Sequence, residues 1–307
     1  VEQLELIGIA AVDATGNALD NHLTGNASAN TIDGGFGADT MAGGRGNDRY
    51  LVDSALDVVV EVSGEGYDTT VVEVAGTYAL SANVEALELG ALAAGGIGNE
   101  LDNAILGNAG GNLLDGGAGA DLLVGGQGND DYVIDDGGDR VQELSGQGFD
   151  RVTSGIDYVL PQHVEQLTLS GSAVRGIGND LDNLLFGNDQ ANILDGRVGA
   201  DQMAGGTGDD RYGVDNASDV VDEGVNAGID TVVSTVSFGL SANVENVVLA
   251  GAADLGATGN ELANVLVGNA GANAIQSGAG NDVLAGGLGD DALDGGAGDD
   301  LYLYHQG

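Results

Sequence analysis

Aspartate recurs at one fixed place of a nine-residue period, and no other pattern in the chain has a clearer chemical meaning. Cut every nine residues from Gly16, the sequence reads GNALDNHLT, GNASANTID, GGFGADTMA, GGRGNDRYL and VDSALDVVV. The sixth place of these blocks holds Asn21, Asn30, Asp39, Asp48 and Asp57. Carboxylate and carbonyl oxygens are hard ligands, and several of them together suit calcium. The spacing therefore predicts a series of calcium sites in glycine-rich turns.

Three further sets of blocks follow, and they begin at Gly98, Gly178 and Gly259. Each block carries an apolar residue at its eighth place, such as Leu23 or Ile32, where a short strand would bury it. Glycine permits backbone conformations closed to other residues, so the first six residues can form a tight turn. We expect each block to be one turn followed by a three-residue strand. Two blocks then make one coil, and turns eighteen residues apart stack on the same edge.

The blocks resemble the RTX family, the repeats-in-toxin or haemolysin-type calcium-binding proteins, whose consensus is Gly-Gly-x-Gly-x-Asp-x-apolar-x. The nearest matches are residues 34–42, 43–51, 116–124, 125–133, 205–213, 286–294 and 295–303. A nine-residue repeat of this composition is typical of a calcium-loaded parallel β-roll. We therefore expect an all-β fold, a right-handed parallel β-roll or β-helix solenoid with calcium-binding glycine-rich turns.

The resemblance also implies which residues hold the ions. One ion would bind the carbonyls of Gly35 and Gly37 and the Asp39 carboxylate, and the next layer would close the site with the Val52 and Ser54 carbonyls and with Asp57. The implied metal ligands over the whole chain are Gly35, Gly37, Asp39, Gly44, Gly46, Asp48, Asp57, Gly117, Gly119, Asp121, Gly126, Gly128, Asp130, Asp139, Asp201, Gly206, Gly208, Asp210, Asp219, Gly278, Gly280, Asp282, Gly287, Gly289, Asp291, Gly295, Ala297 and Asp300.

Two departures from the consensus weaken particular sites. Asparagine at the sixth place offers one neutral oxygen in place of a charged pair, so those turns are weak sites or none. The residues concerned are Asn21, Asn30, Asn103, Asn112, Asn183, Asn192, Asn264 and Asn273. In the third set Arg197 replaces the second glycine, which brings a positive charge and the steric cost of a Cβ. We expect no tight site there.

The charge of the chain agrees with multiple bound calcium ions. There are 49 acidic residues against 7 basic ones, all arginine, and the net charge is −42. Such a charge repels itself in a compact state, and on the order of ten calcium ions would cancel roughly half of it. A halophilic or disordered acidic chain would share this composition, but disorder does not place apolar residues in a nine-residue phase.

The same charge excludes two classes of partner. Nucleic acid and anionic membrane surfaces require clusters of Lys and Arg, and seven scattered arginines form none, so we expect neither nucleic-acid binding nor membrane insertion. No segment is long and apolar enough for a membrane span, and none reads as a signal peptide. The absence of cysteine fits an extracellular bacterial chain that relies on metal.

A longer repeat of 80 to 83 residues overlies the short one, because Val1-Glu2 recurs as Val84-Glu85, Val164-Glu165 and Val244-Glu245. We expect four units: 1–83 with a roll at 16–68, 84–163 with a roll at 98–150, 164–243 with a roll at 178–230, and 244–307 with a roll at 259–307. The chain starts inside a repeat, so we expect it to be part of a longer protein. The spacers alternate as strands do, as in Val152, Ser154 and Ile156; they form wider rungs of one solenoid or, alternatively, separate small β domains.

Catalysis is not expected. His22, His163 and His305 are the only histidines, no catalytic motif is present, and the periodic carboxylates are already explained as ligands. Tyr50, Tyr132, Tyr212 and Tyr302 occupy the eighth place and are expected in the core.

Two roles remain for the whole protein. The first is a calcium-stiffened extender or adhesin region of a secreted or cell-surface bacterial protein, exported by type I secretion machinery, with surface proteins or glycans as candidate partners. The second is the secretion and folding module of a type I-secreted enzyme such as a protease, lipase or alginate epimerase. Four regular units favour the first.

Overall fold

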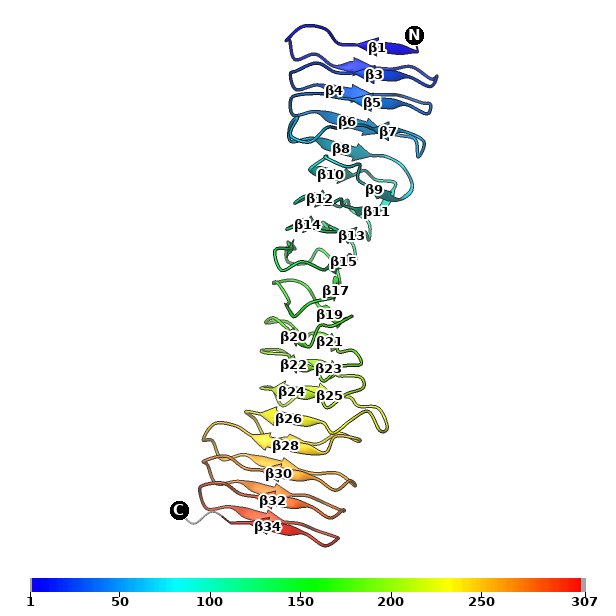
Figure 1. The fold of residues 1–307 in the computed structure, drawn as a ribbon. Coiled ribbons are helices and arrows are strands. Elements are labelled where there is room, and N and C mark those ends of the chain that lie inside the picture. The colour runs from blue at the N-terminus through cyan, green and yellow to red at the C-terminus, as the bar shows by residue number, and fades with distance from the viewer. Residues whose placement is uncertain (1, 305–307) are drawn as a thin grey trace. The chain divides into compact units, whose positions relative to one another are not determined.

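The chain forms a solenoid of short parallel strands joined by tight turns (Figure 1). The structure, a computed structural model, describes residues 2–304, and within them every regular element is a β-strand. Most strands have three or four residues, and each pairs in parallel with the strand about one coil earlier or later. The expected all-β parallel solenoid is confirmed.

The nine-residue frame fixes where the strands lie. Strands of the glycine blocks begin at the seventh place, as in Leu122–Val124, and their central residue faces the core. Leu123 at the eighth place is 0% exposed, whereas Leu122 beside it is 38% exposed. Alternation of buried and exposed side chains follows from the pleat of a strand. The expected phase of the period is therefore confirmed.

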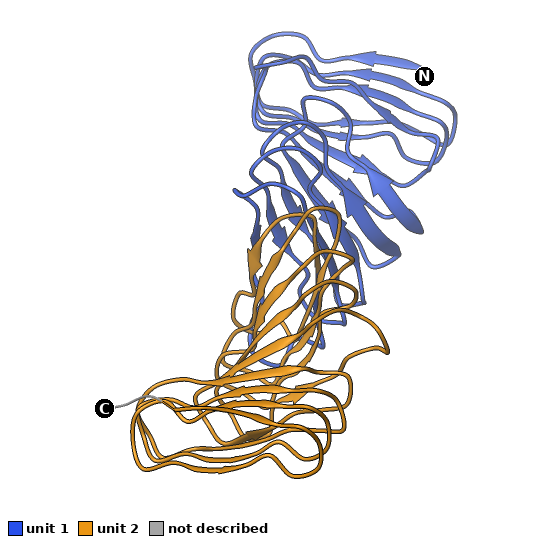
Figure 2. Cartoon of the chain, turned by 60° about the horizontal axis from the view of Figure 1, so that its bottom comes forward, with its two compact units in different colours: residues 1–152 blue, residues 153–307 orange. Residues whose placement is uncertain are grey.

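Two compact units divide the chain, residues 1–152 and 153–307 (Figure 2). Unit 1 holds three parallel sheets. Their strands are, in the first, β1 (Gln3–Glu5), β3 (His22–Thr24), β5 (Thr40–Ala42) and β7 (Val58–Val59); in the second, β2 (Ala14–Thr15), β4 (Thr31–Asp33), β6 (Arg49–Val52), β8 (Thr69–Val72), β10 (Ala86–Leu89), β12 (Ala104–Leu106), β14 (Leu122–Val124) and β16 (Arg140–Val141); and in the third, β9 (Gly76–Ala79), β11 (Ala93–Ile97), β13 (Leu113–Asp115) and β15 (Asp131–Ile134). Strand β17 (Arg151–Ser154) lies at the division.

Unit 2 repeats this construction with three parallel sheets. Their strands are, in the first, β19 (Gln166–Leu169), β21 (Leu184–Phe186), β23 (Gln202–Ala204) and β25 (Val220–Val221); in the second, β18 (Tyr158–Val159), β20 (Arg175–Ile177), β22 (Ile193–Asp195), β24 (Arg211–Val214), β26 (Thr231–Ser234), β28 (Asn246–Leu249), β30 (Val265–Val267), β32 (Val283–Ala285) and β34 (Leu301–Leu303); and in the third, β27 (Phe238–Gly239), β29 (Gly256–Thr258), β31 (Ala274–Gln276) and β33 (Ala292–Asp294).

The first and third spacers continue the solenoid within their units. Strand β8 pairs in parallel with β6 of the preceding roll and with β10, and β26 pairs in the same way with β24 and β28. A separate β domain at either spacer is therefore wrong. The partition into four repeat units, which rests on internal similarity, remains a prediction.

The corners of the spacers depend on one residue each. Asn83, His163 and Asn243 have φ values of 65°, 68° and 67°, in the left-handed region that asparagine and histidine enter more readily than most residues. The amide nitrogens of Asn83 and Asn243 donate to the carbonyls of Glu61 and Glu223, about one coil earlier. Residues 81–83, 161–163 and 241–243 therefore form the corners between spacer strands.

The core consists of stacked eighth-place side chains. Tyr50, Tyr132 and Tyr212 are fully buried, as expected, but Tyr302 is 36% exposed. Tyr302 lies on β34, and no later coil among residues 2–304 covers it, so the core assignment is wrong for this tyrosine. His22 is exposed, and His305 lies outside the described residues.

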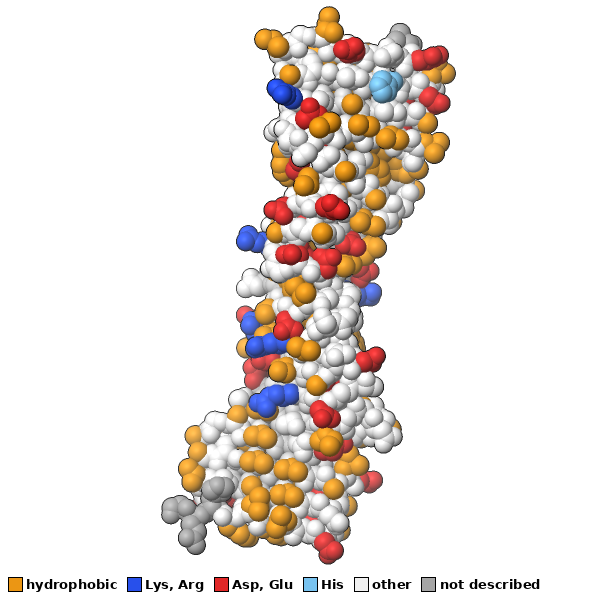
Figure 3. Space-filling view, viewed as in Figure 1, with side chains coloured by type: hydrophobic (Ala, Val, Ile, Leu, Met, Phe, Trp, Pro, Cys, Tyr) orange, Lys and Arg blue, Asp and Glu red, His pale blue; other side chains and the backbone are white. Residues whose placement is uncertain are grey.

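On the viewed surface, both units have exposed acidic side chains interspersed with apolar side chains (Figure 3). Within residues 2–304, no helix has the length and apolar character needed to cross a membrane.

Candidate calcium sites in the glycine-rich turns

The backbone of each glycine-rich turn directs carbonyl groups toward the next turn of the stack. Gly35 and Gly37 have φ values of 74° and 148°, so the second and fourth places of the block take conformations that L-residues rarely adopt. A Cβ on Gly37 would lie 2.8 Å from the carbonyl oxygen of Leu19, the fourth-place residue one coil earlier. Only glycine permits this approach. The Leu19 carbonyl oxygen therefore lies against the next turn of the stack, in a position where it could be a ligand to a cation.

Sixth-place side chains link each coil to the one before it. Oδ1 of the aspartate accepts the backbone N–H of the sixth-place residue eighteen positions earlier, as Asp39 does from Asn21 at 2.7 Å and Asp121 from Asn103 at 2.6 Å. The same bond, at 2.6 to 3.1 Å, is made by Asp48, Asp57, Asp130, Asp139, Asp201, Asp210, Asp219, Asp282, Asp291 and Asp300. The predicted sixth-place residues thus form ladders along the edges of the rolls.

The second carboxylate oxygen is buried without a hydrogen-bond partner at most glycine-rich turns. This holds for Oδ2 of Asp39, Asp48, Asp121, Asp130, Asp201, Asp210 and Asp282, all of which are at most 2% exposed. Burial of an unpaired carboxylate is costly, so such a group must either gain a proton or pair with a cation. Burial raises the pKa of Asp121 and of Asp201 to about 6, partly offset by the N–H bond each accepts. Buried carboxylate oxygens without a hydrogen-bond partner fit a bound calcium ion.

The remaining carboxylates among the predicted ligands are placed differently. Asp57 accepts N–H groups of Asp53 and Ser54 with Oδ2, at 3.2 and 3.1 Å, so its carboxylate also caps its own turn. Asp139 and Asp219 make the equivalent bonds to residues 135–136 and 215–216. In the fourth set Asp291 and Asp300 are only half-buried. These carboxylates lie on the expected edges with fewer free oxygens or less burial.

In turns with asparagine at the sixth place, side-chain amides form hydrogen bonds with the backbone N–H and carbonyl groups. Oδ1 of Asn103 accepts the N–H of Asn99, and Nδ2 of Asn99 donates to the carbonyls of Ser81 and Val84, each at 2.7 Å. The amide donor therefore occupies the position between layers where carbonyls converge. Similar amide bonds to an earlier coil come from Asn26, Asn108, Asn179, Asn188, Asn260 and Asn269. This arrangement supports the expectation that these turns hold weak calcium sites or none.

Arg197 takes the same backbone conformation as the glycines it replaces. Its φ is 63°, against 74° for Gly35 and Gly117 at the corresponding place. For a residue with a Cβ this conformation costs about 1–3 kcal/mol. The strain expected at Arg197 is confirmed, while the weakness of its calcium site remains a prediction.

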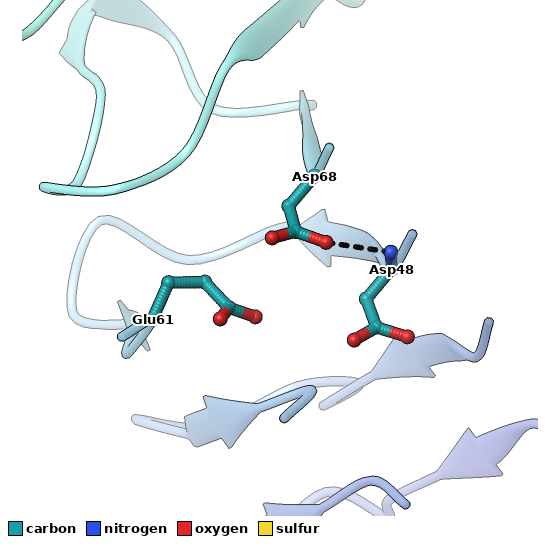
Figure 4. A group of neighbouring side chains, drawn as sticks. All are labelled: Asp48, Glu61 and Asp68. Carbon is teal, nitrogen blue, oxygen red and sulfur yellow. Dashed lines mark hydrogen bonds between the residues drawn. The ribbon is translucent and has the colours of Figure 1, made fainter. Parts of the chain in front are cut away.

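The structure also brings three of the sixth-place aspartates together with carboxylates that the nonapeptide frame did not identify. Asp48, Glu61 and Asp68 turn toward a common space (Figure 4). The equivalent groups are Asp130 with Glu143 and Asp150, and Asp210 with Glu223 and Asp230. The glutamates and the later aspartates lie outside the nine-residue blocks, but each recurs at intervals of 82 and 80 residues, which is the longer repeat of the chain. That longer period was the signal that could have identified them.

Comparison with known proteins agrees with this geometry. The family model of the RTX calcium-binding nonapeptide repeat matches residues 15–50, 97–132, 177–212, 258–293 and 267–302, so each of the four sets of blocks contains at least one match. No curated protein matches the chain. The matched segments contain the glycine turns and the sixth-place ladders described above. The chain is therefore a member of the RTX calcium-binding repeat family, and its fold is the β-roll of those repeats.

Proposed function

We propose that this chain is a structural region of a larger secreted or cell-surface bacterial protein, and that it folds and stiffens when it meets extracellular calcium. The observation that carries this proposal is the series of buried, unpaired Oδ2 atoms on the sixth-place ladders. RTX repeats bind calcium and are typical of secreted bacterial proteins. The proposal adds the coupling of metal binding to folding, the site of folding and the mechanical role.

The coupling follows from the placement of the carboxylates. Asp39 and Asp57 lie on adjacent layers, joined through the Asp39 N–H, and further acidic residues of the chain bring its net charge to −42. Like charges on adjacent layers repel strongly where burial lowers the dielectric constant. The glycine-rich turns also lose a large conformational entropy on ordering. Without cations the coils therefore lack a favourable term that is large enough to order them, and metal binding and folding become one event.

The difference in calcium concentration between the cytosol and the cell exterior determines where the chain folds. Extracellular calcium-binding modules work at about 10⁻⁴ to 10⁻³ M, far above cytosolic calcium. The chain would remain unfolded in the cytosol, pass through type I secretion machinery as an extended polymer, and fold outside. Its glycine-rich coils would then act as a stiff extender that presents neighbouring parts of the protein.

A calcium titration followed by circular dichroism tests the proposal. The metal-free chain should show a coil spectrum that changes cooperatively to a β spectrum between submillimolar and millimolar calcium. Magnesium should substitute poorly, because it prefers small octahedral sites and releases its water reluctantly. A complete β spectrum and an unchanged melting temperature in excess chelator would overturn the coupling.

A further inference from the structure

We propose that each of the three carboxylate clusters, Asp48-Glu61-Asp68, Asp130-Glu143-Asp150 and Asp210-Glu223-Asp230, binds one divalent cation, with calcium as the ion that fits best. In every cluster one oxygen from each residue lies within 4.8 Å of the others. The glutamate and the second aspartate belong to no nonapeptide block. Each cluster therefore adds two carboxylates to a sixth-place aspartate (Asp48, Asp130 or Asp210) that is also a predicted ligand of its glycine-rich turn.

Burial distinguishes these clusters from ordinary acidic patches. Asp48, Glu61 and Asp68 are 2%, 7% and 1% exposed. The side chains of the other two clusters are buried to a similar degree. Arg49, the arginine adjacent to Asp48, makes a two-armed ion pair with Glu88 at 3.0 and 2.7 Å. It is therefore already paired outside the cluster, whose three charges need another counterion.

Several carboxylate oxygens in the clusters have no partner. Oδ1 of Asp48 accepts the Asn30 N–H, and Oδ1 of Asp68 accepts the Asp48 N–H, both at 2.7 Å. Oδ2 of Asp48 is buried and accepts nothing among the described residues. The unpartnered atoms of the other clusters include Oδ2 of Asp130, Asp210 and Asp230 and Oε2 of Glu143 and Glu223. The backbone thus orients Oδ1 of Asp48 and leaves Oδ2 of the same residue available to a ligand.

A tyrosine hydroxyl fixes the glutamate of each cluster. Tyr50 donates to Oε1 of Glu61, and its own oxygen accepts the Gly43 N–H at 2.6 Å. A Cβ on Gly43 would overlap both the Tyr50 hydroxyl and Oδ2 of Asp48, so glycine is needed at this position. The arrangement recurs with Tyr132, Glu143 and Gly125, and the Tyr212 hydroxyl likewise donates to Glu223 and accepts the Gly205 N–H. Three copies with the same tyrosine donor and the same buried, unpartnered Oδ2 on the sixth-place aspartate indicate a built site.

The ligand chemistry selects the ion. Every donor is a hard oxygen, and three carboxylates offer more negative charge than one proton could neutralise. Calcium accepts about six to eight oxygens in a flexible geometry, whereas zinc favours nitrogen and sulfur. An ion here would tie Asp48 of the last glycine-rich turn to Asp68, the residue just before spacer strand β8. It would thereby secure the junction between roll and spacer.

Counting bound ions tests this inference on the full chain. The variant Glu61→Gln/Glu143→Gln/Glu223→Gln removes three charges, and glutamine can still accept the tyrosine hydroxyl bond. Calcium bound per chain, measured by equilibrium dialysis and elemental analysis, should fall by three ions relative to the unaltered chain. The matched control Glu100→Gln/Asp180→Asn/Glu261→Gln removes three exposed carboxylates from asparagine turns and should leave the count unchanged.

The outcomes separate this inference from the proposed function. A cluster variant that binds as many calcium ions as the unaltered chain would overturn the inference and leave calcium-dependent folding intact. An unaltered chain that binds no calcium would overturn both. If the triple variant does not fold, each single substitution should still remove one ion, and tyrosine-sensitised terbium emission should fall in each. The chain has no tryptophan, so tyrosine is the sensitiser. Single variants with unchanged ion counts would overturn the inference.

Discussion

The backbone N–H of Asn103 donates to Oδ1 of Asp121 at 2.6 Å, across one full coil of the roll. The N–H of Asp121 in turn donates to Oδ1 of Asp139 at 3.1 Å. One oxygen of Asp121 therefore holds adjacent coils in register, while Oδ2 remains buried without a hydrogen-bond partner. The Asp121 side chain therefore both stabilises the stacking of the coils, through Oδ1, and contributes to the candidate metal site, through Oδ2.

Asp121→Ala should weaken calcium-dependent stability more than Asn112→Ala. Loss of the carboxylate leaves the Asn103 N–H unpaired, at about 1–3 kcal/mol, and removes a charged calcium ligand. Asn112 uses its side-chain amide instead: it accepts the N–H of Asn108 within its own turn and donates to the Ala93 carbonyl one coil earlier. Its removal should lower stability without changing calcium affinity. Calorimetric calcium titration measures the difference, and equal affinities in the two variants would show that the sixth-place charge does not determine binding.

Leu123→Asp should unfold the coils around β14, whereas Leu122→Asp should be tolerated. The eighth-place Leu123 is fully buried, so the substitution buries an unpaired charge and should cost more than about 4 kcal/mol. Leu122 is 38% exposed, and its substitution should cost about 1 kcal/mol or less. Thermal unfolding in saturating calcium compares the two variants directly. Similar melting temperatures would mean that the nine-residue frame misidentifies the core.

The fold could be predicted from the sequence because the same pattern of glycine and apolar residues recurs in successive nine-residue blocks. Glycines at the second and fourth places and an apolar residue at the eighth define turn, strand and core in one block, as with Gly117, Gly119 and Leu123. The sixth-place ligands follow from the same frame.

The three-carboxylate clusters could not be predicted in this way. Glu61 and Asp68 lie 13 and 20 residues after Asp48, and neither distance is a multiple of nine. Their proximity depends on the length of the first spacer coil, which the nonapeptide period does not determine. The amide bonds of Asn99 to Ser81 and Val84 were missed for a related reason, because they join a roll to the spacer before it.

Without metal, the chain should become less stable as the pH rises from about 4 to about 7. Burial raises the pKa of Asp48 and Asp130 to about 6 and that of Glu61, Glu143 and Glu223 to about 7. The same groups titrate near 4 when unfolded, with the value of about 4 taken from model peptides. The folded state therefore binds more protons across this window, so the free energy of unfolding falls as the pH rises.

Circular dichroism of the metal-free protein at several pH values measures this effect as the fraction of folded chain. Acidification below about 6 should restore β structure in the absence of metal, with the value taken from the raised pKa of Asp48 and Asp130. Calcium should reverse the trend, because protons compete with it for the same carboxylates. If the metal-free stability is constant or rises between about pH 4 and 7, the pKa values of these carboxyl groups are not raised by burial.

Arg197→Gly should stabilise the third set of blocks and strengthen its calcium binding. The residue has a φ of 63°, and glycine adopts this conformation without the Cβ penalty of about 1–2 kcal/mol. The substitution also removes a positive charge from the turn that contains Asp201, whose Oδ2 is buried and unpartnered. The reciprocal change, Gly117→Arg, places arginine at a φ of 74° in the second set, with its Cβ 3.0 Å from the Asn99 carbonyl. It should lower the melting temperature and the calcium affinity by matching amounts. Calorimetric titration and thermal unfolding of both variants provide the comparison, and a loss of stability in Arg197→Gly would mean that the arginine makes a favourable contact that outweighs its backbone strain.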